Sequence, residues 1–323
     1  MILVTGGSGF IGSHFIDYVL ENTDECVINL DSKTYAANNI ERTDSRYTYI
    51  EGGIENQNLI YEILSNHNVS HIINFAAESA VGRSILDPEV FLQTNIFGTY
   101  QLLEATRRWS KEKPDLRFHH VSTDEVYGTL SDNKKAFSEN TPYRPNTPYA
   151  ASKASSDHLV RAWATTYGVN ATITNCSNNY GPRQHKEKLL PLIIDKAING
   201  KPITLHGDGS QVRDWIHVKD HARAIFYVAM YAKPGERYNV GAKNEKTNLE
   251  LATFVCTVLD KLAPKEHGSY LDQIVFVEDR PGNDKRYASD NRKLRSELGW
   301  SPETSWDAGV IDTISWYLKN NTK

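Results

Sequence analysis

Three features are scarce in this sequence: cysteine, long apolar segments and an excess of positive charge. Its cysteines, Cys26, Cys176 and Cys256, are odd in number and far apart, which argues against a disulfide framework and a zinc cluster. No apolar run approaches the roughly 18 residues that span a bilayer. The formal net charge of −4 argues against binding nucleic acid through a broad basic face. We therefore expect no metal site, no membrane span and no nucleic-acid partner.

The sequence does contain enough apolar residues to build a large core. Hydrophobic residues make up 39% of the 323 residues, which suits two lobes or one large α/β unit. Met1 runs directly into an apolar stretch, without the basic region and cleavage site of a secretory signal. The expected location is therefore the cytoplasm.

Short apolar runs alternate with longer amphipathic stretches in the first half of the chain. The runs predict buried parallel strands, and the stretches have the length and period of helices. This alternation predicts a Rossmann-type, doubly wound parallel α/β sheet that binds ligands at the carboxyl ends of its strands. We expect strands over residues 2–5, 26–30, 71–77, 118–122 and 171–177, and helices over 11–20, 58–66, 90–108 and 149–167.

After about residue 178 the alternation loosens, and prolines separate shorter elements. We assign residues 1–177 to the first lobe and 178–323 to a smaller, mixed α/β lobe, which includes a helix over 248–262. A segment near 215–235 is expected to return and pack on the first lobe. The boundary between the lobes is therefore predicted to be interleaved.

A glycine-rich turn lies between the first expected strand and the first expected helix. Gly6, Gly9 and Gly12 allow a tight turn and a close approach of the backbone to a pyrophosphate, which the N-terminus of the helix would bind. Asp31 ends the second strand roughly 20 residues on, where its carboxylate would accept hydrogen bonds from an adenine ribose and repel a 2′-phosphate. This context favours NAD binding over an ordinary glycine turn, although Lys33 lies nearby.

Tyr149 and Lys153 lie four residues apart at the start of an expected helix, so they share one face. A nearby ammonium lowers the pKa of a phenol, which would make Tyr149 a base near neutral pH. Alone, this spacing occurs by chance in many helices. Behind a dinucleotide-binding half it predicts a catalytic pair.

Asp124 and Glu125 follow the strand expected over 118–122, at the edge where an active site is expected. Adjacent carboxylates repel each other unless one of them is held protonated. An acid beside a base is what the elimination of water requires. The alternative interpretation is a solvated turn at the end of the strand.

With these motifs the chain resembles the extended short-chain dehydrogenase/reductase family, and within it the nucleotide-sugar 4,6-dehydratases, most closely those that act on dTDP-glucose. The resemblance covers nearly the whole chain. Further motifs that carry it are Ala76-Ala77-Glu78-Ser79, Thr94-Asn95-Ile96, Cys176-Ser177-Asn178-Asn179-Tyr180-Gly181-Pro182, Glu187-Lys188-Leu189, Arg213-Asp214-Trp215 and Asp279-Arg280-Pro281-Gly282.

The resemblance implies a role for each catalytic residue. Tyr149 is the base for the sugar C4 hydroxyl, assisted by Thr123 and Lys153, while hydride passes from C4 to NAD. Glu125 then removes the C5 proton as Asp124 protonates the departing C6 hydroxyl. Hydride returns to C6, so the cofactor is regenerated in each turnover.

The resemblance also implies two sets of binding residues. The residues implied for NAD are Gly6, Gly9, Phe10, Ile11, Gly12, Asp31, Ser32, Lys33, Thr34, Gly53, Ile54, Phe75, Ala76, Ala77, Ser79, Thr94, Tyr149, Lys153 and Asn179. Those implied for the nucleotide sugar are Ser79, Thr123, Asn178, Lys188, Leu189, Thr204, Leu205, His206, Arg213, Asn248 and Arg280. Arg213 suits the diphosphate best, because a guanidinium pairs with phosphate oxygens through two bonds; a salt bridge between the lobes, to Asp214 or a neighbouring residue, is the alternative.

Four positions depart from the family pattern. Ala80 and Gly82 stand where the family usually has histidine and aspartate, Gly53 replaces a frequent acidic residue, and Asn283 replaces a common histidine. They leave the nucleotide base, the sugar and the cofactor affinity open.

Three alternative functions stay open beside this one: a dehydratase for UDP- or CDP-sugars, a UDP-sugar 4-epimerase, and a catalytically silent NAD-binding protein. Asp124 and Glu125 argue against the epimerase, and the intact Tyr149 and Lys153 argue against the silent protein. The resemblance also implies a homodimer that pairs the helices expected over residues 90–108 and 149–167.

Overall fold

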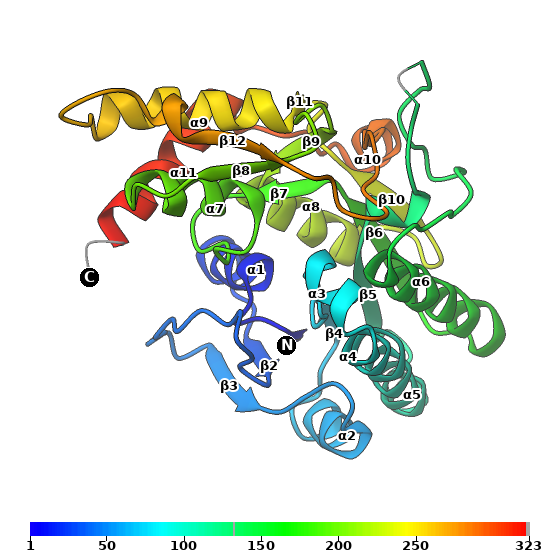
Figure 1. Cartoon of the computed structure of the whole chain (residues 1–323). Coiled ribbons are helices and arrows are strands. Elements are labelled where there is room, and N and C mark those ends of the chain that lie inside the picture. The colour runs from blue at the N-terminus through cyan, green and yellow to red at the C-terminus, as the bar shows by residue number, and fades with distance from the viewer. Residues whose placement is uncertain (132, 321–323) are drawn as a thin grey trace.

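A seven-stranded parallel sheet forms the centre of the larger lobe in the computed structural model, which describes residues 1–131 and 133–320 (Figure 1). The strand order is β10-β6-β5-β4-β1-β2-β3. The sheet confirms the expected doubly wound fold. Its strands are β1 (Ile2–Thr5), β2 (Val27–Asp31), β3 (Tyr47–Glu51), β4 (His71–Asn74), β5 (Arg117–Thr123), β6 (Ala171–Cys176) and β10 (Arg237–Val240).

Helices cover both faces of this sheet because successive side chains of each strand point to opposite faces. In β1, Leu3 packs into one apolar cluster, while Ile2 and Val4 pack into another. The first cluster is covered by α2 (Gln57–Asn66), α5 (Thr99–Trp109) and α6 (Pro148–Tyr167). The second is covered by α1 (Phe10–Asn22) and α8 (Val218–Tyr231).

The smaller lobe has its own apolar core, formed by residues such as Leu190, Ile194 and Val255. Two small sheets contribute to it, in the orders β11-β9-β7 and β12-β8. Its elements are β7 (Asn178–Tyr180), α7 (Leu189–Ile198), β8 (Ile203–His206), β9 (Val212–His217), β11 (Glu245–Thr247), α9 (Asn248–Leu262), η3 (Tyr270–Gln273), β12 (Ile274–Val277) and α11 (Trp306–Asn320), whereas α10 (Arg292–Leu298) packs against α8 and β10 of the larger lobe.

The chain crosses between the lobes more than once. After β9, helix α8 packs against α1 with Ile225 and Phe226 in the core of the larger lobe. Strand β10 then pairs with β6 at the edge of the main sheet. These crossings place residues of the second half of the chain beside the carboxyl ends of β5 and β6.

Most expected elements lie within a few residues of their expected positions. Strand β1 and helix α9 have the expected bounds, whereas the strand expected over 71–77 ends at Asn74. Beyond it the chain leaves the sheet and passes close to the glycine turn, where a Cβ on Gly6 would lie 2.6 Å from the Ala76 nitrogen. Strands β3 and β10 were not predicted, because β3 is a half-exposed edge strand and β10 begins with Arg237.

The helix expected over 90–108 is a composite of three segments. It begins as α4 (Glu89–Phe91), widens into a π-helical turn, η1 (Leu92–Gly98), and continues as α5. The short helix α3 (Val81–Leu86) precedes it. Such π-turns are frequent at functional sites. Within the described residues, no helix has the length and apolarity to span a membrane.

Candidate active site

The glycine turn between β1 and α1 is packed too tightly for side chains. Gly6 has a φ of +70°, and a Cβ on Gly12 would lie 2.5 Å from the Gly6 carbonyl oxygen. Gly9 precedes the first residue of α1, and it provides no side chain to cap the helix. The N–H groups at this helix end are therefore available to a phosphate group.

Asp31 ends β2 beside this turn. Its Oδ2 accepts a hydrogen bond from the Ser8 backbone N–H at 2.8 Å, and its Oδ1 accepts one from the Lys33 N–H at 2.7 Å. These bonds fix the carboxylate next to the glycine turn at which a pyrophosphate is expected. Lys33 adopts a positive φ of 47°, and its ammonium lies over the Tyr49 ring at 4.3 Å.

The tight turn, the open helix end and the adjacent carboxylate fit a dinucleotide. The residues expected to bind it follow the carboxyl ends of neighbouring strands, which brings them to one edge of the sheet. They lie after β1 (Gly6, Gly9, Phe10, Ile11, Gly12), β2 (Ser32, Lys33, Thr34), β3 (Gly53, Ile54) and β4 (Phe75, Ala76, Ala77, Ser79), in η1 (Thr94), in α6 (Tyr149, Lys153) and in β7 (Asn179).

Ile54 and Asn179 are among the residues of this set whose side chains already have partners within the protein. Ile54 is buried, and it packs so close to the helix backbone that a Cβ on Gly98 would lie 2.7 Å from it. Asn179 donates to the Ser177 carbonyl at 3.0 Å and contacts His221 Nδ1 at 2.9 Å. Their contact with a cofactor stays a prediction.

The two adjacent carboxylates lie at the carboxyl end of β5. Thr123 ends the strand, and a 3-10 turn, η2 (Asp124–Tyr127), begins directly after it. The Thr123 hydroxyl caps this turn by accepting from the Glu125 N–H at 3.3 Å. Asp124 is buried, so the pair is not a solvated turn at the protein surface.

The surroundings of Asp124 and Glu125 differ in a way that suits an acid and a base. Burial raises the pKa of Asp124 well above its usual value, and the negative charges of Glu125 and Asp214 raise it further. Burial also raises the pKa of Glu125, but the cations Lys188, Arg213 and Arg280 oppose this shift. Asp124 is therefore held protonated, and the cations favour the ionised form of Glu125.

Tyr149 lies in the first turn of α6, where Thr147 caps the helix. Burial raises its pKa well above the usual value, and the charge of Glu125 adds to this rise. A side-chain hydrogen bond with Thr123 acts in the opposite direction. The expectation that Lys153 lowers the phenol pKa is therefore not met in this structure, because burial and the neighbouring carboxylate dominate.

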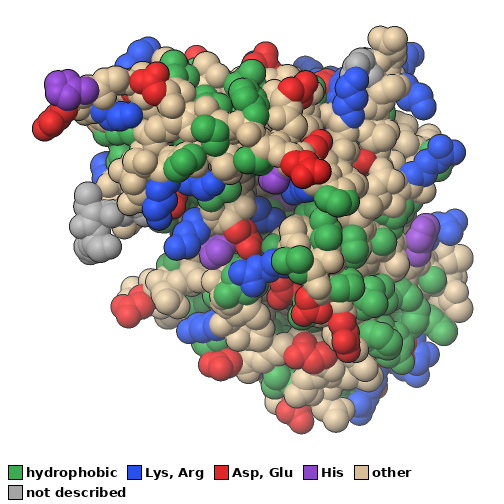
Figure 2. All heavy atoms as spheres, in the orientation of Figure 1, with side chains coloured by type: hydrophobic (Ala, Val, Ile, Leu, Met, Phe, Trp, Pro, Cys, Tyr) green, Lys and Arg blue, Asp and Glu red, His purple; other side chains and the backbone are tan. Residues whose placement is uncertain are grey.

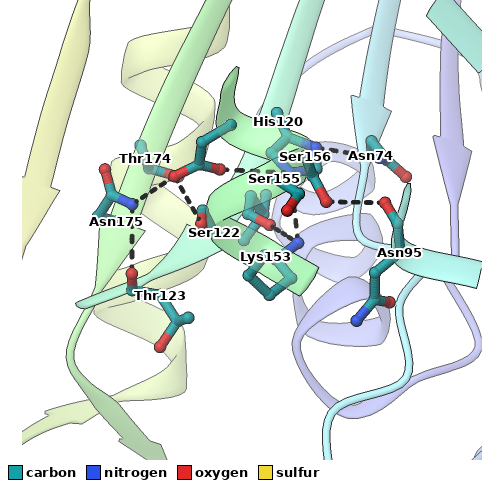
Figure 3. Close-up of polar contacts among 12 residues, drawn as sticks. Asn74, Asn95, His120, Ser122, Thr123, Lys153, Ser155, Ser156, Thr174 and Asn175 are labelled. Carbon is teal, nitrogen blue, oxygen red and sulfur yellow. Dashed lines mark hydrogen bonds and ion pairs between the residues drawn. The ribbon is translucent and has the colours of Figure 1, made fainter. Parts of the chain in front are cut away.

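Lys153 lies one turn further along α6, and it is also buried. Its Nζ donates to the Val121 carbonyl at 2.9 Å and lies 3.3 Å from His120 Nε2 (Figure 3). Burial lowers its pKa to about 8, although the nearby Asp157 raises it. The ammonium is thus held inside the protein beneath the catalytic edge.

Arg213 forms one wall of the site from β9. Its guanidinium donates to the Asp284 carbonyl at 2.9 Å and to Asn283 Oδ1 at 3.3 Å, and lies 4.3 Å from the centre of the Tyr287 ring. None of the ion pairs found among residues 1–131 and 133–320 joins it to Asp214, so the alternative salt bridge is not observed. Its influence on Glu125 places its positive charge at the catalytic end of the site.

Lys188 connects the two lobes. It precedes α7, and its Nζ donates to the Ser79 carbonyl at 2.6 Å. The adjacent Glu187 accepts from the Tyr35 hydroxyl and from Arg83 Nε, both at 3.2 Å. In Figure 2, charged and histidine side chains gather around a hollow between the two halves of the molecule.

The remaining residues expected to bind substrate lie along the smaller lobe. Leu205 is buried in its apolar core, so only the backbone of that residue is free to face a ligand. The Thr204 hydroxyl accepts a hydrogen bond from Lys196 at 2.8 Å. The others lie in β7 (Asn178), at the start of α7 (Leu189), at the end of β8 (His206), at the start of α9 (Asn248) and after β12 (Arg280).

The departures from the family pattern have simple structural consequences. Ala80 is buried directly before α3, and a Cβ on Gly82 would meet no atom within 4 Å. Arg280 donates through Nε and Nη2 to Asn283 Oδ1, so Asn283 holds this arginine in place. A Cβ on Gly53 would lie 2.1 Å from the Glu55 carboxylate, a flexible group that can move.

Several residues of the site were not predicted from the sequence. Ser289 contacts Asp124, Tyr287 underlies Arg213, and His120 and Asp157 surround Lys153. The place of Asp157 could have been predicted from the sequence, because it lies four residues after Lys153 and therefore on the same helix face. No local sequence pattern points to Ser289 or Tyr287, because only the folding of the chain brings them to the site.

Comparisons with known proteins agree with this geometry. A family model described as GDP-mannose 4,6 dehydratase matches residues 3–313. The dTDP-glucose 4,6-dehydratase of Shigella flexneri is 48% identical, over 99% of this chain and 93% of its own length. The dTDP-glucose 4,6-dehydratase of Streptomyces venezuelae, solved with NAD bound, is 41% identical with a TM-score of 0.91, over 99% of this chain and 98% of its own.

The same fold also occurs with a different reaction. The UDP-glucose 4-epimerase of Thermotoga maritima, solved with UDP-glucose, is 28% identical with a TM-score of 0.87, over 99% of both chains. Fold similarity therefore does not separate dehydration from epimerisation. The two reactions have to be distinguished by the side chains at the carboxyl end of β5.

Proposed function

The chain belongs to the extended short-chain dehydrogenase/reductase family, in the branch of the nucleotide-sugar dehydratases, and from this membership we propose the reaction that it catalyses. It uses NAD and converts dTDP-glucose to dTDP-4-keto-6-deoxyglucose with the loss of one water. The observation that carries this assignment is the Asp124–Glu125 pair beside Tyr149, in which burial and neighbouring negative charge raise the pKa of Asp124 while three cations oppose the rise in the pKa of Glu125. A 4-epimerase needs no acid–base pair for elimination.

When bound, NAD accepts the hydride from C4 of the sugar and returns it to C6. Tyr149 takes the proton of the C4 hydroxyl, with Thr123 bonded to its phenol oxygen. Tyr149 can accept this proton only as the phenolate, so its own proton must first leave to solvent, against the burial that raises its pKa. Lys153 supplies the positive charge below the site.

Elimination uses the two carboxylates. A ketone at C4 acidifies the C5 proton, and the ionised Glu125 removes it. The protonated Asp124 donates to the departing C6 hydroxyl, which leaves as water. The negative charge of Glu125 stabilises the proton on Asp124, so the base supports the protonated state that the acid requires.

The cations around Glu125 also suit the diphosphate of the substrate. Arg213 offers a guanidinium that is already oriented by Asn283 and Asp284, and Lys188 and Arg280 add positive charge. We propose that these groups bind the diphosphate from the smaller lobe, while residues 1–177 hold the cofactor. The cytoplasmic location rests on the sequence alone and stays a prediction.

The direct test is incubation of the purified protein with dTDP-, UDP- and CDP-glucose, with analysis of each product by mass. We expect dTDP-glucose to lose one water without accumulation of reduced cofactor. Loss of water from UDP- or CDP-glucose alone would support the alternative dehydratase. A product of unchanged mass with inverted C4 would instead identify an epimerase and contradict the assignment.

We also propose that the protein is a homodimer. Aromatic side chains form an exposed strip across η1, α5 and α6, in which Phe97 is 55% and Tyr167 49% exposed. Tyr100 and Trp163 connect them, with ring centres 5.8 Å apart. A second copy of this chain would cover this strip. Light scattering should give twice the chain mass, and Phe97→Asp should reduce it; a monomeric unaltered protein would contradict the proposal.

A further inference from the structure

A buried polar network lies beneath the catalytic edge, between β5 and α6 (Figure 3). It contains three titratable side chains that are at most 3% exposed: His120, Lys153 and Asp157. Burying three such groups is costly unless each has partners. The proposed mechanism uses only Lys153, so the other two require an explanation.

His120 contacts both of the other groups through one atom. Its Nε2 lies 3.3 Å from Lys153 Nζ and 3.6 Å from Asp157 Oδ1. On the other side of the ring, Asn74 donates its amide to Nδ1 at 3.1 Å, and Asn74 is itself held by the Thr5 hydroxyl at 2.7 Å. The Lys153 ammonium, which can only donate hydrogen bonds, thus meets the ring at Nε2, the nitrogen that also faces the carboxylate.

The two carboxylate oxygens of Asp157 have different surroundings. Its Oδ2 accepts hydrogen bonds from Tyr143 at 2.6 Å and from Ser122 and Asn175, both at 3.0 Å. Its Oδ1 is buried and accepts no hydrogen bond from any residue that the structure describes. A buried carboxylate oxygen without a partner would pair directly with a nearby ammonium if nothing separated them. Here the imidazole contacts both groups.

We propose that His120 and Asp157 are positioning residues for Lys153: the carboxylate stabilises the ammonium from a distance, and the imidazole prevents their direct contact. Lys153 Nζ thus bonds to the Val121 carbonyl rather than to Asp157. The ammonium keeps its charge inside the protein and remains placed to serve the cofactor and Tyr149. This inference rests on the proposed function.

Few titratable groups influence the charge of Lys153. Asp157 lies on the same helix, His120 on β5, and Cys176 on β6, where burial keeps the thiol protonated by raising its pKa. Around Asp157 the further polar groups are Tyr143 and the Arg237 guanidinium, which lies 4.9 Å from the centre of the Tyr143 ring. Asp157 is therefore the carboxylate whose charge raises the pKa of Lys153.

Opposite effects on Lys153 follow for the two positioning residues. Removing the carboxylate in Asp157→Asn removes a group that raises the pKa of Lys153, so the lysine loses its proton at lower pH. Removing the ring in His120→Ala allows Asp157 to pair directly with Lys153, so the lysine keeps its proton to higher pH. In that variant the ammonium is drawn inward, away from its ligands.

The test uses the holoprotein and follows oxidation at C4 over a range of pH with dTDP-glucose. In the unaltered protein we expect the rate to fall as pH rises past about 8, where Lys153 loses its proton. Asp157→Asn should move this limit down by about one pH unit. His120→Ala should move it up, with kcat reduced about tenfold and KM for the sugar nearly unchanged.

His119→Ala is the matched control. His119 is also a buried imidazole on β5, but it points to the opposite face and bonds to Thr172 and Thr174. Its removal should leave the pH limit and the kcat of oxidation in place. A second readout avoids turnover: cofactor-free protein is titrated with NAD by calorimetry, and we expect His120→Ala to weaken binding several-fold and His119→Ala not to.

The outcomes separate this inference from the proposed function. Absence of dehydration in the unaltered protein would contradict the function itself. If the unaltered protein dehydrates the sugar and the two variants shift the pH limit in the same direction, or not at all, the positioning roles are wrong. Equal losses in His120→Ala and His119→Ala would likewise show a merely structural role.

Discussion

The Ser289 hydroxyl lies 3.1 Å from Asp124 Oδ2, although the two residues are 165 positions apart in the sequence. Both side chains are buried, so the contact is shielded from water. Ser289 comes from the segment after β12 that runs back to the larger lobe, where Phe137 and Ser289 form an isolated bridge. The second half of the chain therefore supplies a partner for the catalytic acid as well as binding groups.

Ser289→Ala should slow elimination without affecting oxidation at C4. The hydrogen bond lowers the pKa of Asp124, so its loss raises that pKa further and Asp124 stays protonated. What is lost is the orientation of the acid, which we expect to cost about 1 kcal/mol, or roughly fivefold in the elimination rate. Single-turnover product analysis measures this, with the exposed Ser296→Ala as control. Equal slowing of oxidation would show that Ser289 has a wider structural role.

Glu125→Gln should permit reduction of the bound cofactor but stop the reaction before water is lost. The amide has nearly the same shape and cannot accept the C5 proton, so elimination should fall by about 10²-fold or more. Rapid mixing with dTDP-glucose would show reduced cofactor that persists. If the variant forms dehydrated product at the normal rate, Glu125 is not the base.

Gly12→Ala should weaken NAD binding by at least about tenfold. The added Cβ would lie 2.5 Å from the Gly6 carbonyl oxygen and 2.9 Å from Gly7 Cα, so the turn that faces the pyrophosphate must move. Gly82→Ala adds the same atom where no atom lies within 4 Å and serves as control. Calorimetric titration with NAD compares the two; equal affinities would argue against the glycine turn as the binding site.

Acid should destabilise the protein partly through buried histidines. Burial lowers the pKa of His119 to about 3, so the folded state resists the proton that the unfolded chain binds near pH 6.5. This stability is complete above about pH 6.5 and is lost as pH falls toward about 3. Between about pH 7 and about pH 5, His119 alone accounts for about 2 kcal/mol of the expected loss.

Chemical denaturation of the unaltered protein and of His119→Ala at both pH values isolates this contribution. The free energy of unfolding should fall less in the variant than in the unaltered protein over this range. The comparison is needed because buried carboxylates such as Asp214, whose pKa is raised to about 6, act in the opposite direction. An identical fall in both proteins would contradict the assignment to His119.

The sequence predicted those parts of the fold that depend on local patterns. Buried parallel strands leave continuous apolar runs, so β1 was found at its true bounds. Strand β3 has only half-buried and exposed residues, so its weaker pattern was missed. Strand β10 was missed because it is defined by its pairing with β6, which no local pattern reveals.

In the active site, too, the sequence predicted the features that depend on local patterns and not those that depend on the fold. Asp124, Glu125, Tyr149 and Lys153 belong to short motifs whose positions after a strand or within a helix are local properties. Their protonation states depend on burial and on distant charges, which is why the pKa of Tyr149 was predicted in the wrong direction. Ser289 could not be predicted, because its contact depends on where the returning segment crosses the sheet.

The most direct test of the proposed reaction follows deuterium placed at C4 of dTDP-glucose. Because one bound cofactor takes the hydride from C4 and returns it to C6 after Glu125 and Asp124 have removed water, the label should appear at C6 of a dehydrated product. Dehydrated product with the label lost to solvent would contradict the internal transfer. An undehydrated sugar with inverted C4 that keeps its label there would contradict the assignment of the reaction itself.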